Sequence, residues 1–224
     1  MVMAIVEIPK EDISKTAALN TKITKILAII IMVSGILVMF GWIADIGILK
    51  SVLPQWVTMK FITALCFLLS GIVLYSAAKF KEQKADTIKI ILIITGVALI
   101  SLAGILLISS AFGAASSNAT LFYGEEIGAV KTTAPGRPSV ATMANFILIG
   151  VAAILTAVKK RLARIVKYLG CLVLLLGLAA IIGYILDVPA LYFSFEGYST
   201  AMAFHTALLF VMWGIGAFLL EKNR

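Results

Sequence analysis

The sequence has little charge, and what it has lies outside its long apolar runs. Of its 224 residues, 13% are charged and 62% are hydrophobic, whereas soluble domains carry about 25% charged and about 45–50% apolar residues. No Asp, Glu, Lys or Arg lies in the middle of any long apolar run. Ion-coupled pumps and transporters usually place ionisable residues there. A coupled transporter is therefore not expected.

Residues that hold metals and cofactors are also scarce. The chain has one histidine and two cysteines, and Cys66 and Cys171 each lie alone in an apolar run. A metal or haem site needs several His, Cys or carboxylate ligands close together. No phosphate-binding loop, G-x-S-x-G or H-E-x-x-H motif occurs. We therefore expect no metal, no cofactor and no enzymatic activity in this chain.

The apolar residues form six runs, each long enough to cross a bilayer core, which takes roughly 20 helical residues. The runs are 26–44, 61–79, 88–110, 140–158, 166–186 and 203–220. They predict an all-α integral membrane protein with six transmembrane helices. Residues 1–23 are expected to be a cytoplasmic segment, and 24–222 a single six-helix membrane domain.

The distribution of positive charge sets the orientation. If the N-terminus is cytoplasmic, fifteen of the nineteen Lys and Arg residues fall on the inside. The exceptions are Lys50, Lys60, Lys131 and Arg137. The positive-inside rule accounts for this asymmetry, so the net charge of +8 does not indicate nucleic acid. We predict a cytoplasmic (cell) membrane protein with both termini inside.

One phrase recurs along the chain. Met59–Gly71 and Met202–Gly214 agree at seven of thirteen positions, and Pro138–Gly150 keeps the Thr, Phe and Gly at the same offsets. Each copy opens the second helix of a helical hairpin, and the hairpins span about 24–80, 88–159 and 165–222. All three would run inside–outside–inside. The sequence therefore predicts parallel repeats.

The shared residues of the phrase suggest helix packing. A large and a small residue recur one turn apart, which suits close contact between helices in lipid; these are Phe67 with Gly71, Phe146 with Gly150, and Phe210 with Gly214. The recurring hydroxyls are Thr63, Thr142 and Thr206. We interpret them as packing residues that bond a preceding carbonyl or a neighbouring helix. The alternative is that they converge with three helix N-termini on one ligand site.

Three further polar residues are candidates for ligand binding or sensing. His205 is interpreted as an interfacial side chain that caps or points outward, with pH sensing as the alternative. Asp45 and Asp187 are expected to cap the loop helices that follow them, with cation binding as the alternative. The aromatic residues near the outer loops are predicted to anchor at the headgroups, with lining of a ligand site as the alternative; they are Trp42, Trp56, Tyr192 and Tyr198.

Several stretches resemble a known family. They are Gly41–Asp45, Leu49–Pro54, Met59–Gly71, and Pro135–Arg137 followed by Thr142 and Phe146. They resemble the N-terminal multi-helix membrane module of prokaryotic sensor histidine kinases with PAS domains and of some diguanylate cyclases. The resemblance implies an input module that senses a stimulus at or in the membrane and passes it inward through the last helix. No kinase, cyclase or PAS pattern occurs in the 224 residues, so output is expected from a cytoplasmic signalling domain or partner.

The first hypothesis is therefore a multi-pass membrane sensory or regulatory module for signal transduction. An accessory or structural subunit of a membrane complex is a second hypothesis, with a membrane partner subunit as its partner. A homodimer is a further expected assembly of the chain. A passive channel or uncoupled carrier is a third, because three hairpins could enclose a path. The lipid bilayer is a partner under all three.

Overall fold

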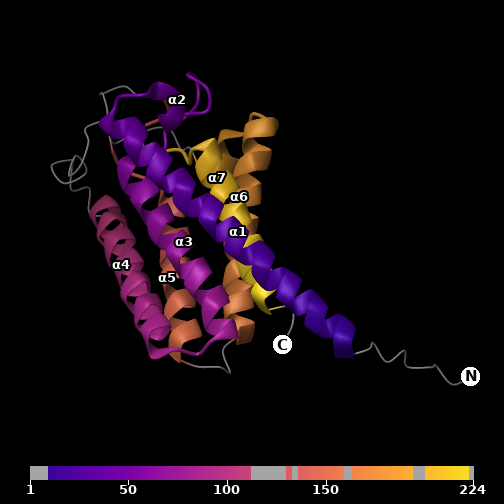
Figure 1. The fold of residues 1–224 in the computed structure, drawn as a ribbon. Coiled ribbons are helices and arrows are strands. Elements are labelled where there is room, and N and C mark those ends of the chain that lie inside the picture. Colours follow the sequence, from indigo (N-terminus) through magenta and orange to yellow (C-terminus); the bar gives the residue numbers. More distant parts are fainter. Residues whose placement is uncertain (1–9, 112–129, 133–135, 159–162, 194–199, 222–224) are drawn as a thin grey trace, which may run out of the picture.

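The chain folds into a bundle of long helices in a computed structural model (Figure 1). The structure describes residues 10–111, 130–132, 136–158, 163–193 and 200–221. Its elements are α1 (Lys10–Ile43), α2 (Gly47–Lys50), α3 (Phe61–Glu82), α4 (Asp86–Ala111), α5 (Val140–Val158), α6 (Ala163–Ile185), the 3₁₀ turn η2 (Pro189–Tyr192) and α7 (Phe204–Glu221). Every element in these ranges is helical, which confirms the predicted all-α class.

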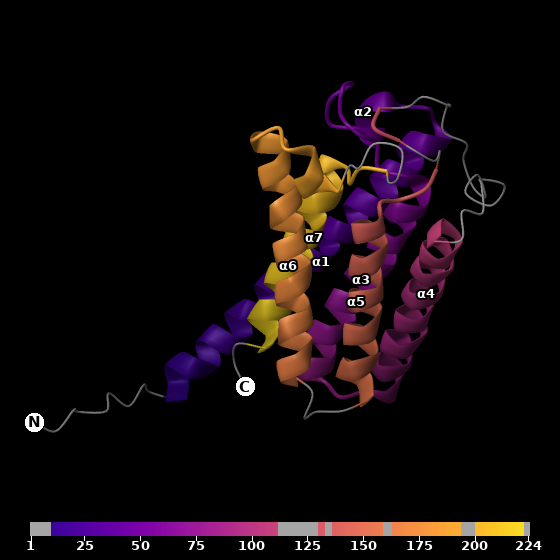
Figure 2. The ribbon, with the colours of Figure 1, turned by 180° about the vertical axis from the view of Figure 1, so that it is seen from behind.

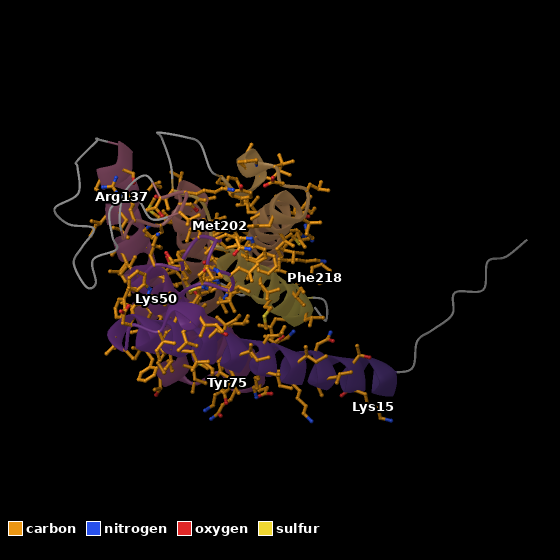
Figure 3. The ribbon with its side chains drawn as sticks, turned by 90° about the horizontal axis from the view of Figure 1, so that it is seen from above. Lys15, Lys50, Tyr75, Arg137, Met202 and Phe218 are labelled. Carbon is orange, nitrogen blue, oxygen red and sulfur yellow. The ribbon has the colours of Figure 1, made fainter. Side chains whose placement is uncertain are left out.

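The first helix is longer than the apolar run that predicted it. α1 begins at Lys10, well before residue 26, so much of the expected N-terminal segment is helical. The added turns contain Ala17, Ala18 and Leu19, which favour helix whether or not they lie in lipid. The length of the apolar run thus underestimates the length of the helix. Its first turns project beyond the bundle, and Lys15 lies far out along them in the view from above (Figure 3).

Five helices are long and apolar enough to cross a membrane by length and composition: α1, α3, α4, α5 and α6. The sixth predicted run corresponds to Phe204–Leu220, a shorter apolar helix within α7. At about 1.5 Å per residue, its 17 residues cover slightly less than a bilayer core of about 30 Å. The chain thus has the character of a helical membrane protein.

The helices pack most extensively as sequential pairs, α1 with α3, α4 with α5 and α6 with α7 (Figures 1 and 2). Glycines allow close approach within each pair. A Cβ on Gly71 would lie 2.8 Å from the Ala28 carbonyl oxygen in α1. A Cβ on Gly150 would lie 2.7 Å from the Gly96 carbonyl oxygen in α4. A Cβ on Gly214 would lie 2.7 Å from the Gly170 carbonyl oxygen in α6. A larger residue at any of these positions would force the two helices apart.

The second helix of each pair lies toward the inside of the bundle. In α3 and α5, 56% of the most apolar window is buried, against 33% in α1 and 28% in both α4 and α6. Contacts of α3 with both α5 and α7 place it centrally. α1 begins and α7 ends at the same end of the bundle (Figures 1 and 2). We call this the terminal end, and the opposite end, which carries α2 and η2, the loop end.

The turns that follow α1 and α6 share one geometry, and it corrects the predicted role of the aspartates. Asp45 and Asp187 have φ of 55° and 51°, a left-handed conformation that commonly terminates a helix. The next amides donate back across five residues, from Ile46 to Gly41 and from Val188 to Gly183, both at 2.8 Å. Ile46 and Val188 are themselves the N-caps of α2 and η2, and neither makes a side-chain capping bond. The aspartates therefore end the long helices and do not cap the short ones.

Candidate functional site

Three phenylalanines from the three inner helices meet in the middle of the bundle. The ring centroid of Phe67 lies 5.0 Å from that of Phe146 and 4.9 Å from that of Phe210. The centroids of Phe146 and Phe210 are 5.1 Å apart. Their exposed fractions are 0%, 1% and 0%. The rings are tilted or edge-on, as aromatic quadrupoles favour. We call this cluster the aromatic plug, because it fills the space between α3, α5 and α7.

The recurring threonines lie one turn toward the loop end from the plug. Thr63, Thr142 and Thr206 are each 2% exposed or less, and the four-residue offset puts each on the same helix face as its phenylalanine. The Thr142 hydroxyl shares a 2.7 Å hydrogen bond with Ser139, whose oxygen also accepts from the Thr142 amide at 3.1 Å and so caps α5. The Thr206 hydroxyl has no partner among the described residues. Of these two hydroxyls, only that of Thr142 makes a hydrogen bond, and its partner lies in the same turn.

Asn145 is a buried polar residue whose importance the sequence did not reveal. It precedes Phe146 on α5 and is 0% exposed. Neither its amide nitrogen nor its carbonyl oxygen has a partner in the described part of the chain. Leaving a buried amide without a hydrogen-bond partner is costly in free energy. Its position beside a repeated Phe was visible in the sequence, but its orientation was not.

A small void lies below the plug, toward the terminal end. A cavity of about 30 Å³ lies among α3, α5, α6 and α7, with Leu74, Ala153 and Trp213 in its lining. That volume suits about one water molecule. The Trp213 indole nitrogen donates to the Ser70 carbonyl at 3.1 Å and joins α7 to α3 there. Together with the plug, this packing closes the centre of the bundle.

A larger cavity lies at the loop end between α1, the α2 turn and α7. It has a volume of about 290 Å³, near the lower limit of small-molecule sites, which run from about 300 Å³ upward. We call it the loop-end cavity. Its lining comprises Ile30, Ser34, Leu37, Val38, Ile48, Leu49, Ser51, Val52, His205, Leu208, Leu209 and Met212. The lining is aliphatic apart from two serines and the histidine.

His205 lies in this cavity wall, which corrects its predicted outward position. It is the second residue of α7. Both ring nitrogens are buried, and neither has a hydrogen-bond partner among the residues that the structure describes. The side chain therefore neither caps a helix nor reaches for the headgroups. It offers one donor and one acceptor in its neutral form.

Two predicted interface anchors are buried instead. Trp42 is 8% exposed, and its indole nitrogen donates to the Met59 carbonyl at 2.8 Å. Tyr192 is 1% exposed and stacks on Tyr184 at 4.4 Å between centroids. Trp56 is half-buried and contacts Phe204 at 4.8 Å. Trp56 also lies 5.2 Å from Tyr184 between ring centroids and so joins the loop end of the first hairpin to that of the third. Composition alone suggested membrane anchoring for these rings.

The fourth predicted anchor, Tyr198, lies outside the described residues.

Of the two candidate aspartates, Asp45 is exposed and accepts a hydrogen bond from Lys50. The Lys50 ammonium lowers the pKa of the Asp45 carboxyl below its ordinary value of about 3.8, first by this hydrogen bond and then by its charge. Lys50 also lies 4.7 Å from the Trp42 ring centre. The Asp45 carboxylate is thus paired with the Lys50 ammonium. Asp187 is exposed and lies at the same kind of turn.

A buried lysine connects the loop end to the segment before α5. Lys60 is 2% exposed, and its ammonium donates to the hydroxyls of Thr58 at 3.2 Å and Thr132 at 3.0 Å. The sequence marked Lys60 only as an outer charge. Its burial arises because it precedes α3, where the loops of two hairpins meet.

Within the described ranges, no cluster of three or more His, Cys, Asp or Glu side chains could hold a metal ion. No protein-family model, curated protein or solved structure matches the chain. The candidate site therefore rests on the geometry of the loop end: the cavity with His205, the buried threonines and Asn145, and the plug beneath them.

Proposed function

We propose that this chain is a multi-pass membrane sensory or regulatory module with its loop end outside a prokaryotic cell. In this proposal it spans the membrane six times as three parallel hairpin repeats, and both termini are cytoplasmic. The inside excess of Lys and Arg supports the orientation. The matching glycine contacts of the three helix pairs and the matching turns after α1 and α6 support the repeats. The resemblance to sensor-protein membrane modules supports the function.

The observation that carries the proposal is the aromatic plug. Phe67, Phe146 and Phe210 fill the middle of the bundle and lie between a ligand-sized cavity at one end and a void of about 30 Å³ at the other. A passive channel needs a path along this axis, whereas a sensor needs a site at one end and helices that can shift. The packing therefore favours a sensor over a channel.

α7 is the element suited to carry a signal to the terminal end. It contributes His205 to the loop-end cavity. Farther along α7, the Gly216 carbonyl accepts a 3.2 Å hydrogen bond from the Thr24 hydroxyl of α1. The Lys81 ammonium of α3 donates to the Leu220 carbonyl in its last turn. A ligand would shift α7 against α1 and α3 only if it binds one packing better than the other. These terminal-end contacts are the ones such a shift would change.

A disulfide between α3 and α7 would report this movement. A Cβ on Gly216 would lie 3.5 Å from Leu74 Cγ, so Leu74→Cys with Gly216→Cys places the sulfurs within bonding reach. Cys66 and Cys171 are replaced by Ala first, because both are free. We expect the rate of disulfide formation in reconstituted vesicles to change on addition of an effective stimulus. Candidate stimuli are lipids of different headgroup and chain length and small lipophilic molecules.

A matched control pair lies within one hairpin. Lys25 and Glu82 form an ion pair of 2.6 Å between α1 and α3, close enough for a carbodiimide to join the two side chains as an amide. The rate of this coupling should not change with any stimulus. If the α3–α7 rate is also constant across all stimuli, the sensory proposal is wrong. Recovery of a stoichiometric membrane partner in mild detergent, together with that constancy, would support the accessory-subunit hypothesis.

A further inference from the structure

The loop-end cavity opens toward the lipid-facing side of the bundle. Five residues of its lining have substantially exposed side chains: Ile30 at 43%, Leu37 at 47%, Ile48 at 78%, Val52 at 47% and Leu208 at 43%. All five are aliphatic. In a bilayer, surface of this kind faces acyl chains, because only apolar groups are inexpensive there. A molecule dissolved in the bilayer can therefore reach the cavity from the side.

The polar groups of the cavity restrict what it can hold. No Asp, Glu, Lys or Arg belongs to the lining, so a charged group placed there would have no counter-charge in an apolar wall. The Ser51 hydroxyl is already engaged with the carbonyls of Leu53 at 2.7 Å and Trp56 at 3.1 Å. His205 is different, because neither ring nitrogen has a partner in the described part of the chain. A pure hydrocarbon would leave that imidazole unsatisfied, at a cost in free energy.

We propose that the loop-end cavity binds an uncharged, membrane-soluble molecule whose hydroxyl or carbonyl head pairs with His205 and whose apolar body lies between α1 and α7. Fatty alcohols and quinones share this chemistry. The imidazole can donate to a carbonyl or accept from a hydroxyl, with a small rotation of the ring to present the nitrogen. The aliphatic walls formed by Ile30, Leu209 and Met212 contact the body of the ligand.

The role of this cavity as the input of a sensor rests on the proposed function. Binding of a ligand to the cavity can be measured separately. Binding without any change in α3–α7 cross-linking would overturn the role of this cavity as the sensory input and leave the binding site intact. A cross-linking response to another stimulus, with no binding at this cavity, would overturn the site and leave the sensory role intact.

The test is photolabelling of the full chain in phosphatidylcholine vesicles with a fatty alcohol that carries a diazirine in its chain. We expect mass spectrometry to find the label on α1 between Ile30 and Val38 and on α7 between His205 and Met212. Unlabelled 1-decanol should compete about three- to tenfold better than decane, the factor that one net hydrogen bond supplies. The ionised decyl sulfate should compete less well than 1-decanol. A short-chain quinone as competitor then distinguishes carbonyl from hydroxyl heads.

Three variants sharpen the result. His205→Phe keeps a ring but removes both nitrogens, and should abolish the advantage of 1-decanol over decane. Val52→Trp fills the exposed rim at a turn outside the helices and should reduce labelling severalfold. Leu172→Trp, on the exposed side of α6 at 43% exposure, is the matched control and should leave labelling unchanged.

Labelling spread evenly over lipid-facing residues such as Leu172 would contradict the proposal. Equal competition by 1-decanol and decane on the unmodified protein would contradict it too, and that comparison does not depend on any variant folding. Either result would mean that acyl chains of ordinary lipids fill the cavity.

Discussion

Removing one ring of the aromatic plug should destabilise the bundle measurably. In Phe210→Ala the contacts with Phe67 and Phe146, at 4.9 Å and 5.1 Å between centroids, are both lost. Each aromatic pair contributes about 0.5–1.5 kcal/mol beyond area burial, which gives about 1–3 kcal/mol for the two. The cavity left behind adds to this. Transfer from water adds little, because helices separated in a membrane remain in lipid.

The upper limit is therefore the roughly 3–5 kcal/mol that Phe→Ala costs in soluble cores. The assay is reversible unfolding in mixed micelles, followed by circular dichroism and by Trp fluorescence. Phe40→Ala is the matched control, because Phe40 is 53% exposed on α1 and should change stability by no more than about 0.5 kcal/mol. If Phe210→Ala and Phe40→Ala have equal effects, the plug does not stabilise the bundle as its geometry indicates.

Two further predictions concern a helix contact and a charged pair. Gly150→Ala should destabilise the bundle by about 1–3 kcal/mol through overpacking, since its Cβ would lie 2.7 Å from the Gly96 oxygen. Gly104→Ala is the control in the same unfolding assay. Its Cβ would have nothing within 4 Å, so it should not destabilise the bundle, and Ala favours the helix slightly over Gly. Lys50→Met should raise the pKa of Asp45 toward its ordinary value of about 3.8, because the ammonium that lowers it is gone; carboxyl-carbon NMR titration in micelles measures this. Any stability from the pair is present above the unfolded pKa and is lost as the pH falls through the folded pKa. An unshifted NMR midpoint in Lys50→Met would contradict the assigned pairing.

The sequence predicted the helices well because apolar length and the absence of internal charge are properties of composition. It located five long apolar helices and the shorter α7 close to their observed bounds. It misplaced the start of α1 because Ala17, Ala18 and Leu19 extend a helix without extending the apolar run. Helix propensity and lipid contact are separate causes of helix length, and the length of an apolar run reflects only the second.

Side-chain direction was the part that the sequence could not supply. Trp42 and Tyr192 have the composition of headgroup anchors, yet the loops fold back so that both rings are buried in the bundle. His205 likewise was expected to point outward and lies in a cavity wall. The recurrence of Phe67, Phe146 and Phe210 pointed to helix contacts, but that all three rings meet one another depends on how the hairpins are arranged in space.

The most direct test of the account is the α3–α7 disulfide in vesicles that contain 1-decanol. With Leu74→Cys and Gly216→Cys, we expect the alcohol to change the rate of disulfide formation and decane at equal membrane concentration to leave it unchanged. We also expect His205→Phe to remove the difference. A rate that the alcohol leaves unchanged, in vesicles where photolabelling shows the loop-end cavity to be occupied, would contradict the claim that occupancy of this cavity moves α7.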